Sequence, residues 1–111
     1  MKDRDQDDHE DQKRIQQLQK QERDRELNDL RYVVKNPGGR RFLWRLLSAC
    51  GVYRSSIAGT PEATYTNEGK RLIGLAILND LNAALPTALL QMQQEHESDL
   101  EARQTNNAQE E

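Results

Sequence analysis

The side chains best suited to chemistry in this sequence are guanidinium groups gathered around its single tryptophan. They lie in the stretch NPGGRRFLWRLLSACGVYR, residues 36–54, which also holds the only Phe and the only Cys. Guanidinium groups are always charged, and their planar forks bind carboxylates or phosphates through two hydrogen bonds at once. A neighbouring tryptophan adds an apolar anchor of the kind that dominates protein interfaces. The candidate partner- or anion-binding residues are Arg40, Arg41, Trp44, Arg45 and Arg54, with Arg71 further along the chain.

The sequence alone leaves three interpretations of this cluster open. The arginines can form a surface for a partner protein. They can bind a nucleic-acid backbone, although the acidic flanks of the chain count against this. Gly38 and Gly39, at the start of the expected helix, would let an anion approach its free N–H groups. The arginines can instead pair inside the molecule and fix how its helices meet, with carboxylates at Asp29, Glu62, Glu68 or Asp80.

Other parts of the sequence offer little for catalysis or for metal binding. His9 and His96 both lie in charged flanks, away from the apolar surroundings that tune catalytic histidines. The acidic stretch DRDQDD, residues 3–8, lacks the central Gly and terminal Glu of a calcium-binding loop. The single Cys50 cannot form an intrachain disulfide, and we expect it to pack as a small apolar side chain. We therefore expect no enzymatic activity, no catalytic residues, no cofactor and no metal site.

Composition divides the chain into a basic centre and two acidic flanks. Residues 1–28 carry 7 Lys/Arg against 9 Asp/Glu, residues 29–95 carry 8 against 5, and residues 96–111 carry 1 against 5. Nearly all large apolar side chains lie in the central segment. A domain of that size buries only about 60% of its unfolded surface, so oligomerisation or a host assembly would help to stabilise it.

The distribution of apolar residues predicts a small all-α fold with disordered acidic tails. We expect residues 1–10 to be disordered, residues 11–28 to form a charged solvated helix, residues 29–98 to form a small helical domain, and residues 99–111 to be a disordered polar tail. No segment shows the alternating pattern of a β-strand. No stretch approaches the roughly 20 apolar residues of a membrane span, so we expect no membrane association and a location in the virion or host cytoplasm.

Three core helices are predicted within the central domain. Asn36-Pro37 favours a helix start, because Asn is a preferred N-cap and Pro is tolerated at the first helical position. The first core helix spans residues 37–50 and ends at Gly51, a residue suited to the left-handed conformation. The second begins at Glu62 or Asn67 and ends near Ala84, and the third covers residues 86–98.

Apolar residues predict which helix faces are buried. Residues 42, 43, 46, 47 and 50 form one broad stripe on the first core helix. The second core helix is apolar around most of its circumference, which is typical of the most buried helix of a domain. Gly69 and Gly74 lower helix propensity by about 1 kcal/mol each, so we expect both to permit close approach of a neighbour. Val52, Tyr53 and Ile57 are expected to hold the intervening loop against the domain.

Several segments resemble a known family. The runs DLRYVVKNPGGRRFLWRLLSACGVYRSS, EGKRLIGLAILNDL and LLQMQQE, between Asp29 and Glu95, resemble small proteins of tailed bacteriophages, mainly short-tailed podoviruses and their prophages. The family pattern reads Pro-x-Gly-Arg-Arg-Phe-x-Trp-Arg-Leu-Leu, then Cys-Gly-Val, then Glu-Gly-x-Arg-x-x-Gly. The resemblance implies a phage protein of the structural and assembly set, and it implies no enzymatic role.

The function expected from these observations is binding. Our first hypothesis is a virion-associated or morphogenesis protein that docks on a larger phage structural protein or on itself, through the helices at 37–50 and 66–84. The alternatives are a nucleic-acid-binding accessory in DNA packaging or early host takeover, and a small inhibitor of a host protein.

Overall fold

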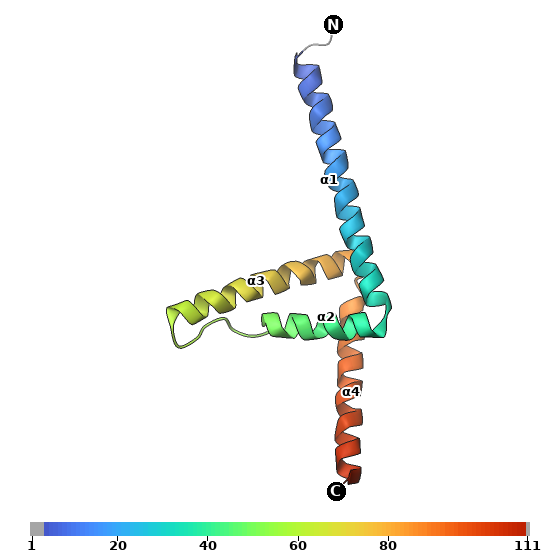
Figure 1. The fold of residues 1–111 in the computed structure, drawn as a ribbon, viewed down its shortest axis with the longest axis vertical. Helices are drawn as coiled ribbons and strands as arrows, with labels where there is room; N and C mark the ends of the chain where they lie inside the picture. The colour runs from blue at the N-terminus through green and yellow to red at the C-terminus, as the bar shows by residue number, and fades with distance from the viewer. Residues whose placement is uncertain (1–3, 111) are drawn as a thin grey trace.

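The computed structural model describes residues 4–110, which fold into four α-helices joined by short connections (Figure 1). No strand occurs within this range, which confirms the all-α prediction. The long first helix is followed by three shorter ones. Their bounds are α1 Arg4–Lys35, α2 Pro37–Cys50, α3 Pro61–Ala84 and α4 Ala88–Glu110.

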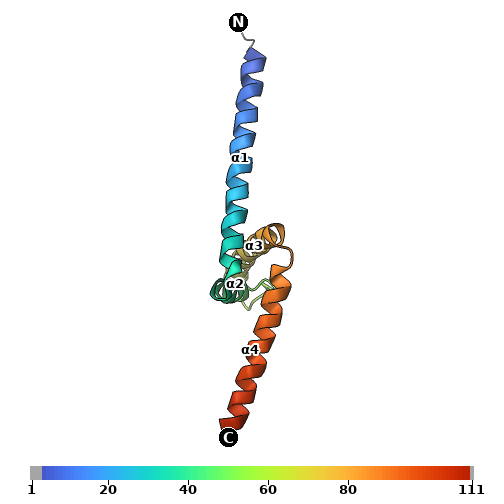
Figure 2. The ribbon, with the colours of Figure 1, turned by 90° about the vertical axis from the view of Figure 1, so that its right-hand side faces the viewer.

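The helices form a junction from which two arms project. α2 and α3 lie side by side as a hairpin to one side, and α1 and α4 leave the junction in opposite directions (Figures 1 and 2). The molecule measures 85 × 39 × 16 Å, and its Cα radius of gyration is 21.0 Å. A compact chain of this length would have a radius of gyration of about 13 Å. Much of this protein therefore lies outside any core.

The core is small and sits where the four helices meet. α1 contributes Val34, α2 contributes Leu43 and Leu47, and α3 contributes Leu81, all of them buried. Met92 and three smaller side chains complete the buried set, and Leu81 has no exposed surface. The complete buried apolar set is Val34, Leu43, Leu47, Val52, Leu81, Ala84, Ala88 and Met92.

The predicted boundaries of α2 are confirmed. Asn36 is extended, with φ −103° and ψ 140°, and α2 begins at Pro37 as expected. The Asn36 side chain makes no capping hydrogen bond, so the break between α1 and α2 comes from the backbone restriction before proline. Gly51 ends α2 in the left-handed conformation with φ 71°, and its N–H donates to the carbonyl oxygen of Ser48.

The two glycines of α3 have different environments. Gly74 is buried, and a Cβ atom there would lie 2.6 Å from the Cβ of Cys50 and 2.5 Å from Cγ1 of Val52. Its close approach to α2 is as predicted. A Cβ at Gly69 would meet nothing within 4 Å, so the same prediction was wrong for that residue.

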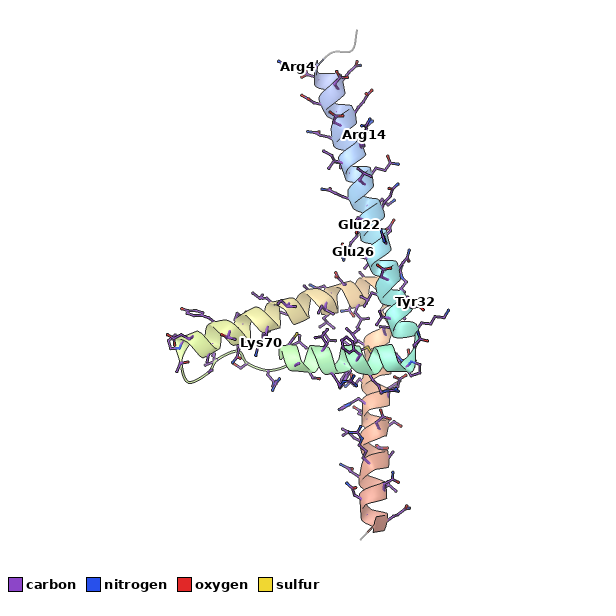
Figure 3. All side chains as sticks on the ribbon, in the orientation of Figure 1. Arg4, Arg14, Glu22, Glu26, Tyr32 and Lys70 are labelled. Carbon is purple, nitrogen blue, oxygen red and sulfur yellow. The ribbon has the colours of Figure 1, made fainter. Side chains whose placement is uncertain are left out.

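The arms are helical further out than the sequence predicted. Residues 4–10 continue α1 and residues 99–110 continue α4, where we expected disordered tails. Neither segment contains Gly or Pro, and charged and polar helix formers can extend a helix without burying apolar surface. Arg4 and Arg14 are exposed, and their side chains project into solvent from α1 (Figure 3). The remainder of the predicted tails, residues 1–3 and 111, lies outside the described residues.

Several apolar side chains that were predicted to be buried are exposed. Phe42 is 57% exposed on α2, and Leu72 and Ile73 are 58% and 62% exposed on α3. α3 is therefore buried chiefly near its C-terminal end, where α1 crosses it, and is not the most buried helix along its whole length. In the loop after α2, Val52 is buried as expected, whereas Tyr53 and Ile57 face solvent. Helical period alone does not reveal how far a neighbouring helix extends along a face.

Within residues 4–110, none of the single helices is long and apolar enough to cross a membrane. Only α3 and α4 taken together reach the required length and composition, and these two are bent by 110° at the residues between them.

Candidate functional site

The structure divides the six predicted site residues between two places. Arg40, Arg41, Trp44 and Arg45 line a cleft between α2 and α4, with a volume of about 160 Å³. Arg54 and Arg71 line a separate depression at the far end of the α2–α3 hairpin, with a volume of about 300 Å³. The sequence grouped Arg54 with the arginines at 40–45 because it could not show how the hairpin separates its two ends.

Arg40 is a structural residue of the cleft. Its Nε donates to both carboxylate oxygens of Glu95, at 2.9 and 3.0 Å, and its Nη2 lies 2.9 Å from Oε1. Its Nη1 donates to the carbonyl oxygens of Val34 and Lys35, at 2.9 and 3.2 Å, at the C-terminal end of α1. The Arg40 side chain is only 11% exposed. Internal pairing is confirmed for this arginine, but with Glu95, which we had not named as a partner.

Trp44 is held by α4. Its ring lies 5.0 Å from the His96 ring, centroid to centroid, with an angle of 31° between the planes. Both residues are half-buried. The tryptophan therefore forms one wall of the cleft and keeps part of its surface available.

Arg41 and Arg45 are the free cations of the cleft. Both are exposed, and within residues 4–110 neither makes a hydrogen bond or ion pair. Glu95 and Asp99 are the carboxylates on the cleft wall, and Glu95 already binds Arg40. The lining therefore has more guanidinium groups than carboxylates, and Arg103 of α4 adds another. Such a surface favours an incoming carboxylate or another anion.

The start of α2 serves packing. Gly39 lies against the last turn of α1, and a Cβ there would collide with the carbonyl oxygen of Val33. The Arg40 N–H already donates to the carbonyl oxygen of Asn36, at 3.1 Å. The expected anion approach is therefore blocked by α1 at Gly39, whereas a Cβ at Gly38 would meet only Nη2 of Arg41, at 3.9 Å.

The second location is a basic depression at the open end of the hairpin. Arg54 donates from Nη2 to the carbonyl oxygen of Ser48, at 2.8 Å, and Arg71 lies 3.7 Å from Glu68. Lys70 lies on the side of α3 that faces the loop (Figure 3). Asn67 donates to the Ser56 carbonyl oxygen at 3.3 Å and ties the loop to α3. Three cations thus converge on a polar hollow.

Two further internal contacts, both made by arginines of α1, differ from the predicted pairs. Asp80 binds Arg23 of α1 at 2.8 Å, and its hydrogen bond raises the pKa of that guanidinium. Arg31 donates from Nε to the Ala84 carbonyl oxygen at 2.6 Å, at the C-terminal end of α3. These two contacts fix the crossing of α1 over α3 and were not predicted.

Sequence reasoning missed the α4 half of the cleft. Met92, His96, Asp99 and Arg103 recur at intervals of four, three and four residues, which places them on one helix face. This spacing is visible in the sequence, but the predicted helix end at residue 98 left Asp99 and Arg103 outside the helix. In residues 4–110 no group of three or more His, Cys, Asp or Glu side chains could hold a metal ion.

The central part of the chain matches a known protein family. The model of a protein family described as Bbp19-like phage protein matches residues 30–94, more than half of the chain. The match covers the junction and the α2–α3 hairpin and leaves out most of both arms. No curated protein and no solved structure matches the chain.

Proposed function

The chain belongs to the Bbp19-like phage protein family, and from this premise we propose that it acts by binding a larger phage protein, in the virion or during particle assembly, without catalysing a reaction. The likeness of its central motifs to proteins of short-tailed phages supports a place in that group. The partner would be a structural protein of the particle.

The observation that carries the proposal is the open shape of the chain. With a radius of gyration of 21.0 Å, it extends well beyond the ~13 Å of a compact chain of this length. Within residues 4–110, eight apolar side chains are buried and thirteen large ones are exposed, so many large apolar side chains face solvent. A fold of this kind is suited to a larger assembly, where neighbouring chains complete the burial.

The α2–α4 cleft is our choice for the docking site. Trp44 offers an apolar wall, and Arg41 and Arg45 offer unpaired guanidinium groups beside it. Arg40 braces α2 against α4, so the cleft is already formed before a partner arrives. A segment that presents a carboxylate next to an apolar side chain would match this chemistry.

The location is tested by mass spectrometry of density-purified particles. We expect this chain in stoichiometric amounts relative to a structural protein. If purified particles contained none while infected cells contained the protein, a virion role would be wrong and a transient assembly role would remain to be tested by capture.

The docking site is tested by capture from infected cells with tagged full-length protein. The double variant Arg41→Ala/Arg45→Ala should lose the phage structural protein that the natural sequence captures. Arg14→Ala/Arg25→Ala removes the same charge from α1 and should retain it. Recovery of a host enzyme in place of a phage protein would favour the inhibitor hypothesis, and equal capture by both variants would move the site elsewhere.

A second candidate function rests on the basic depression. Arg54, Lys70 and Arg71 converge with two serine hydroxyls around it, as phosphate-contacting surfaces do. If it binds a nucleic-acid backbone, duplex DNA should be retarded at low salt, and affinity should fall steeply between roughly 50 and 200 mM salt. Lys70→Ala should reduce that salt slope. Absence of retardation at low ionic strength would remove this candidate.

A further inference from the structure

The outward face of α3 carries a heptad seam that no other helix within residues 4–110 covers. Its six residues are spaced four, three, four, three and four apart, the interval that keeps side chains on one side of a helix pair. Tyr65 is 75% exposed and Leu72 is 58% exposed, and a Cβ at Gly69 would stand in open space. All members are exposed. The seam consists of Tyr65, Gly69, Leu72, Ala76, Asn79 and Ala83.

The seam lies opposite the face of α3 that packs in the junction. Gly74 and Leu81, which fall between seam positions on the far side of the helix, are buried against the rest of the protein. α1 and α2 lie together on one side of α3 when this helix is viewed end-on (Figure 2). The seam therefore runs along about 28 Å of solvent-exposed helix, from residue 65 to residue 83.

Side-chain size alternates along the seam in a self-complementary order. Larger residues stand at 65, 72 and 79, and small ones stand at 69, 76 and 83. In an antiparallel pair of identical helices centred on residue 74, Leu72 of one copy would face Ala76 of the other. In the same register Tyr65 would face Ala83, and Asn79 would face Gly69. Each large side chain then meets a small one, which fills space evenly and allows the helices to approach closely.

We propose that a second copy of this chain occupies the seam, with the two α3 helices antiparallel about a two-fold axis near residue 74. Self-complementarity of one patch with itself is what a two-fold interface requires. This interface lies away from the α2–α4 cleft, so it goes beyond the proposed function and stands or fails separately from it.

The charges beside the seam agree with this arrangement. In the antiparallel register Glu68 would face Asn82 of the other copy, and Asp80 would face Thr66, so no like charges meet. Ile73, which is 62% exposed, would face its own counterpart near the axis and add apolar contact.

A parallel pair fits the same residues worse. It would stack Tyr65 on Tyr65 and Gly69 on Gly69, which alternates crowded layers with empty ones. It would also set Glu68 against Ile73 and Asp80 against Leu75, so that charged groups meet apolar ones. The antiparallel pair avoids both mismatches.

The first test measures the mass of the full-length protein in solution across a concentration series. We expect a species of two chains of 12.8 kDa each. Ala76→Glu places a charge at the centre of the seam and should weaken self-association by roughly a hundredfold, since a carboxylate would be buried without a partner. Ala102→Glu, the same change on the exposed surface of α4, should leave it unchanged. A chain that stays monomeric throughout, or a dimer indifferent to Ala76→Glu, would overturn the proposal.

The second test determines orientation by disulfide formation in a Cys50→Ser background. The chains Gly69→Cys and Asn79→Cys should each fail to cross-link alone and should cross-link when mixed. Cross-linking of either variant with itself would indicate a parallel pair and contradict the register. Because both positions are exposed in the single chain, circular dichroism of each variant should match that of the parent.

Discussion

The junction and the arms of this molecule are held together by different physics. At the junction, side chains from all four helices pack around Leu81, and Gly74 brings α2 and α3 into contact. Along the outer part of α1 every described side chain from residue 4 to residue 26 is exposed, so that segment depends on local helix propensity and charge pairs. The family match, residues 30–94, covers the junction and not these outer segments. Cooperative stability should therefore be concentrated at the junction.

The sharpest contrast between the two regions should come from one leucine in each. Leu81→Ala removes a side chain with no exposed surface and should cost about 2 to 5 kcal/mol, enough to unfold much of a domain this small. Leu18→Ala, in the arm, should change stability by less than about 0.5 kcal/mol. Urea unfolding followed by circular dichroism measures both. Equal losses would mean that the arm packs against something in solution.

The two glycines of α3 test the contact itself. Gly74→Ala gains helix propensity but forces a Cβ against Cys50 and Val52, and overpacking of this kind costs about 1 to 3 kcal/mol. Gly69→Ala has open space and should stabilise by up to about 1 kcal/mol. Thermal unfolding at a low protein concentration compares them. A stabilising Gly74→Ala would show that α2 and α3 can separate without loss.

Two arginines of the cleft have different roles: Arg40 stabilises the fold, whereas Arg45 is assigned to partner binding. Arg40→Ala removes hydrogen bonds to Glu95 and to two α1 carbonyls and should destabilise by about 1 to 3 kcal/mol. Arg45→Ala should change the free energy of unfolding by less than about 0.5 kcal/mol, because that side chain is exposed and makes no ion pair within residues 4–110. Chemical denaturation gives both values. Equal effects would contradict the assignment of Arg45 to partner binding.

The smallest effect is expected from shortening the α1 arm. Deleting residues 4–14 should reduce the helical signal in proportion to length and shift the unfolding free energy by less than about 0.5 kcal/mol. Hydrogen exchange should agree, with fast exchange before residue 20 and the slowest exchange around Leu47 and Leu81. Slow exchange throughout the arm would indicate that a second chain covers it.

Much of the fold could be predicted because its boundaries are marked by particular residues. Pro37 and Gly51 delimit α2 through backbone restrictions that act locally, so sequence predicts them well. The start of α3 was predicted at Glu62 or Asn67, whereas the helix begins at Pro61. Burial depends on neighbouring helices. Phe42 and Leu72 are residue types that are common in cores, yet both are exposed. The outer ends of α1 and α4 were predicted wrongly for a related reason. A helix that stays in solvent needs no apolar pattern, so the pattern does not mark where it ends.

The cleft could be predicted only by half. Its α2 residues are close together in the sequence, and guanidinium groups beside a tryptophan indicate either anion binding or internal ion pairs. Glu95 of α4 lies 55 positions after Arg40, and the two could be matched only once the 110° bend between α3 and α4 was known. Local sequence carries no measure of that angle.

The Arg40–Glu95 ion pair has a mechanical consequence for α4. The helix is about 34 Å long and joins α3 through residues 85–87, so a tilt of 10° at its base would carry its far end roughly 6 Å sideways. Arg40 holds α4 at Glu95, about a third of the way along the helix. A group that competed with Arg40 for the Glu95 carboxylate would weaken this contact. A small displacement of α4 at the cleft would then produce a larger displacement at its C-terminal end.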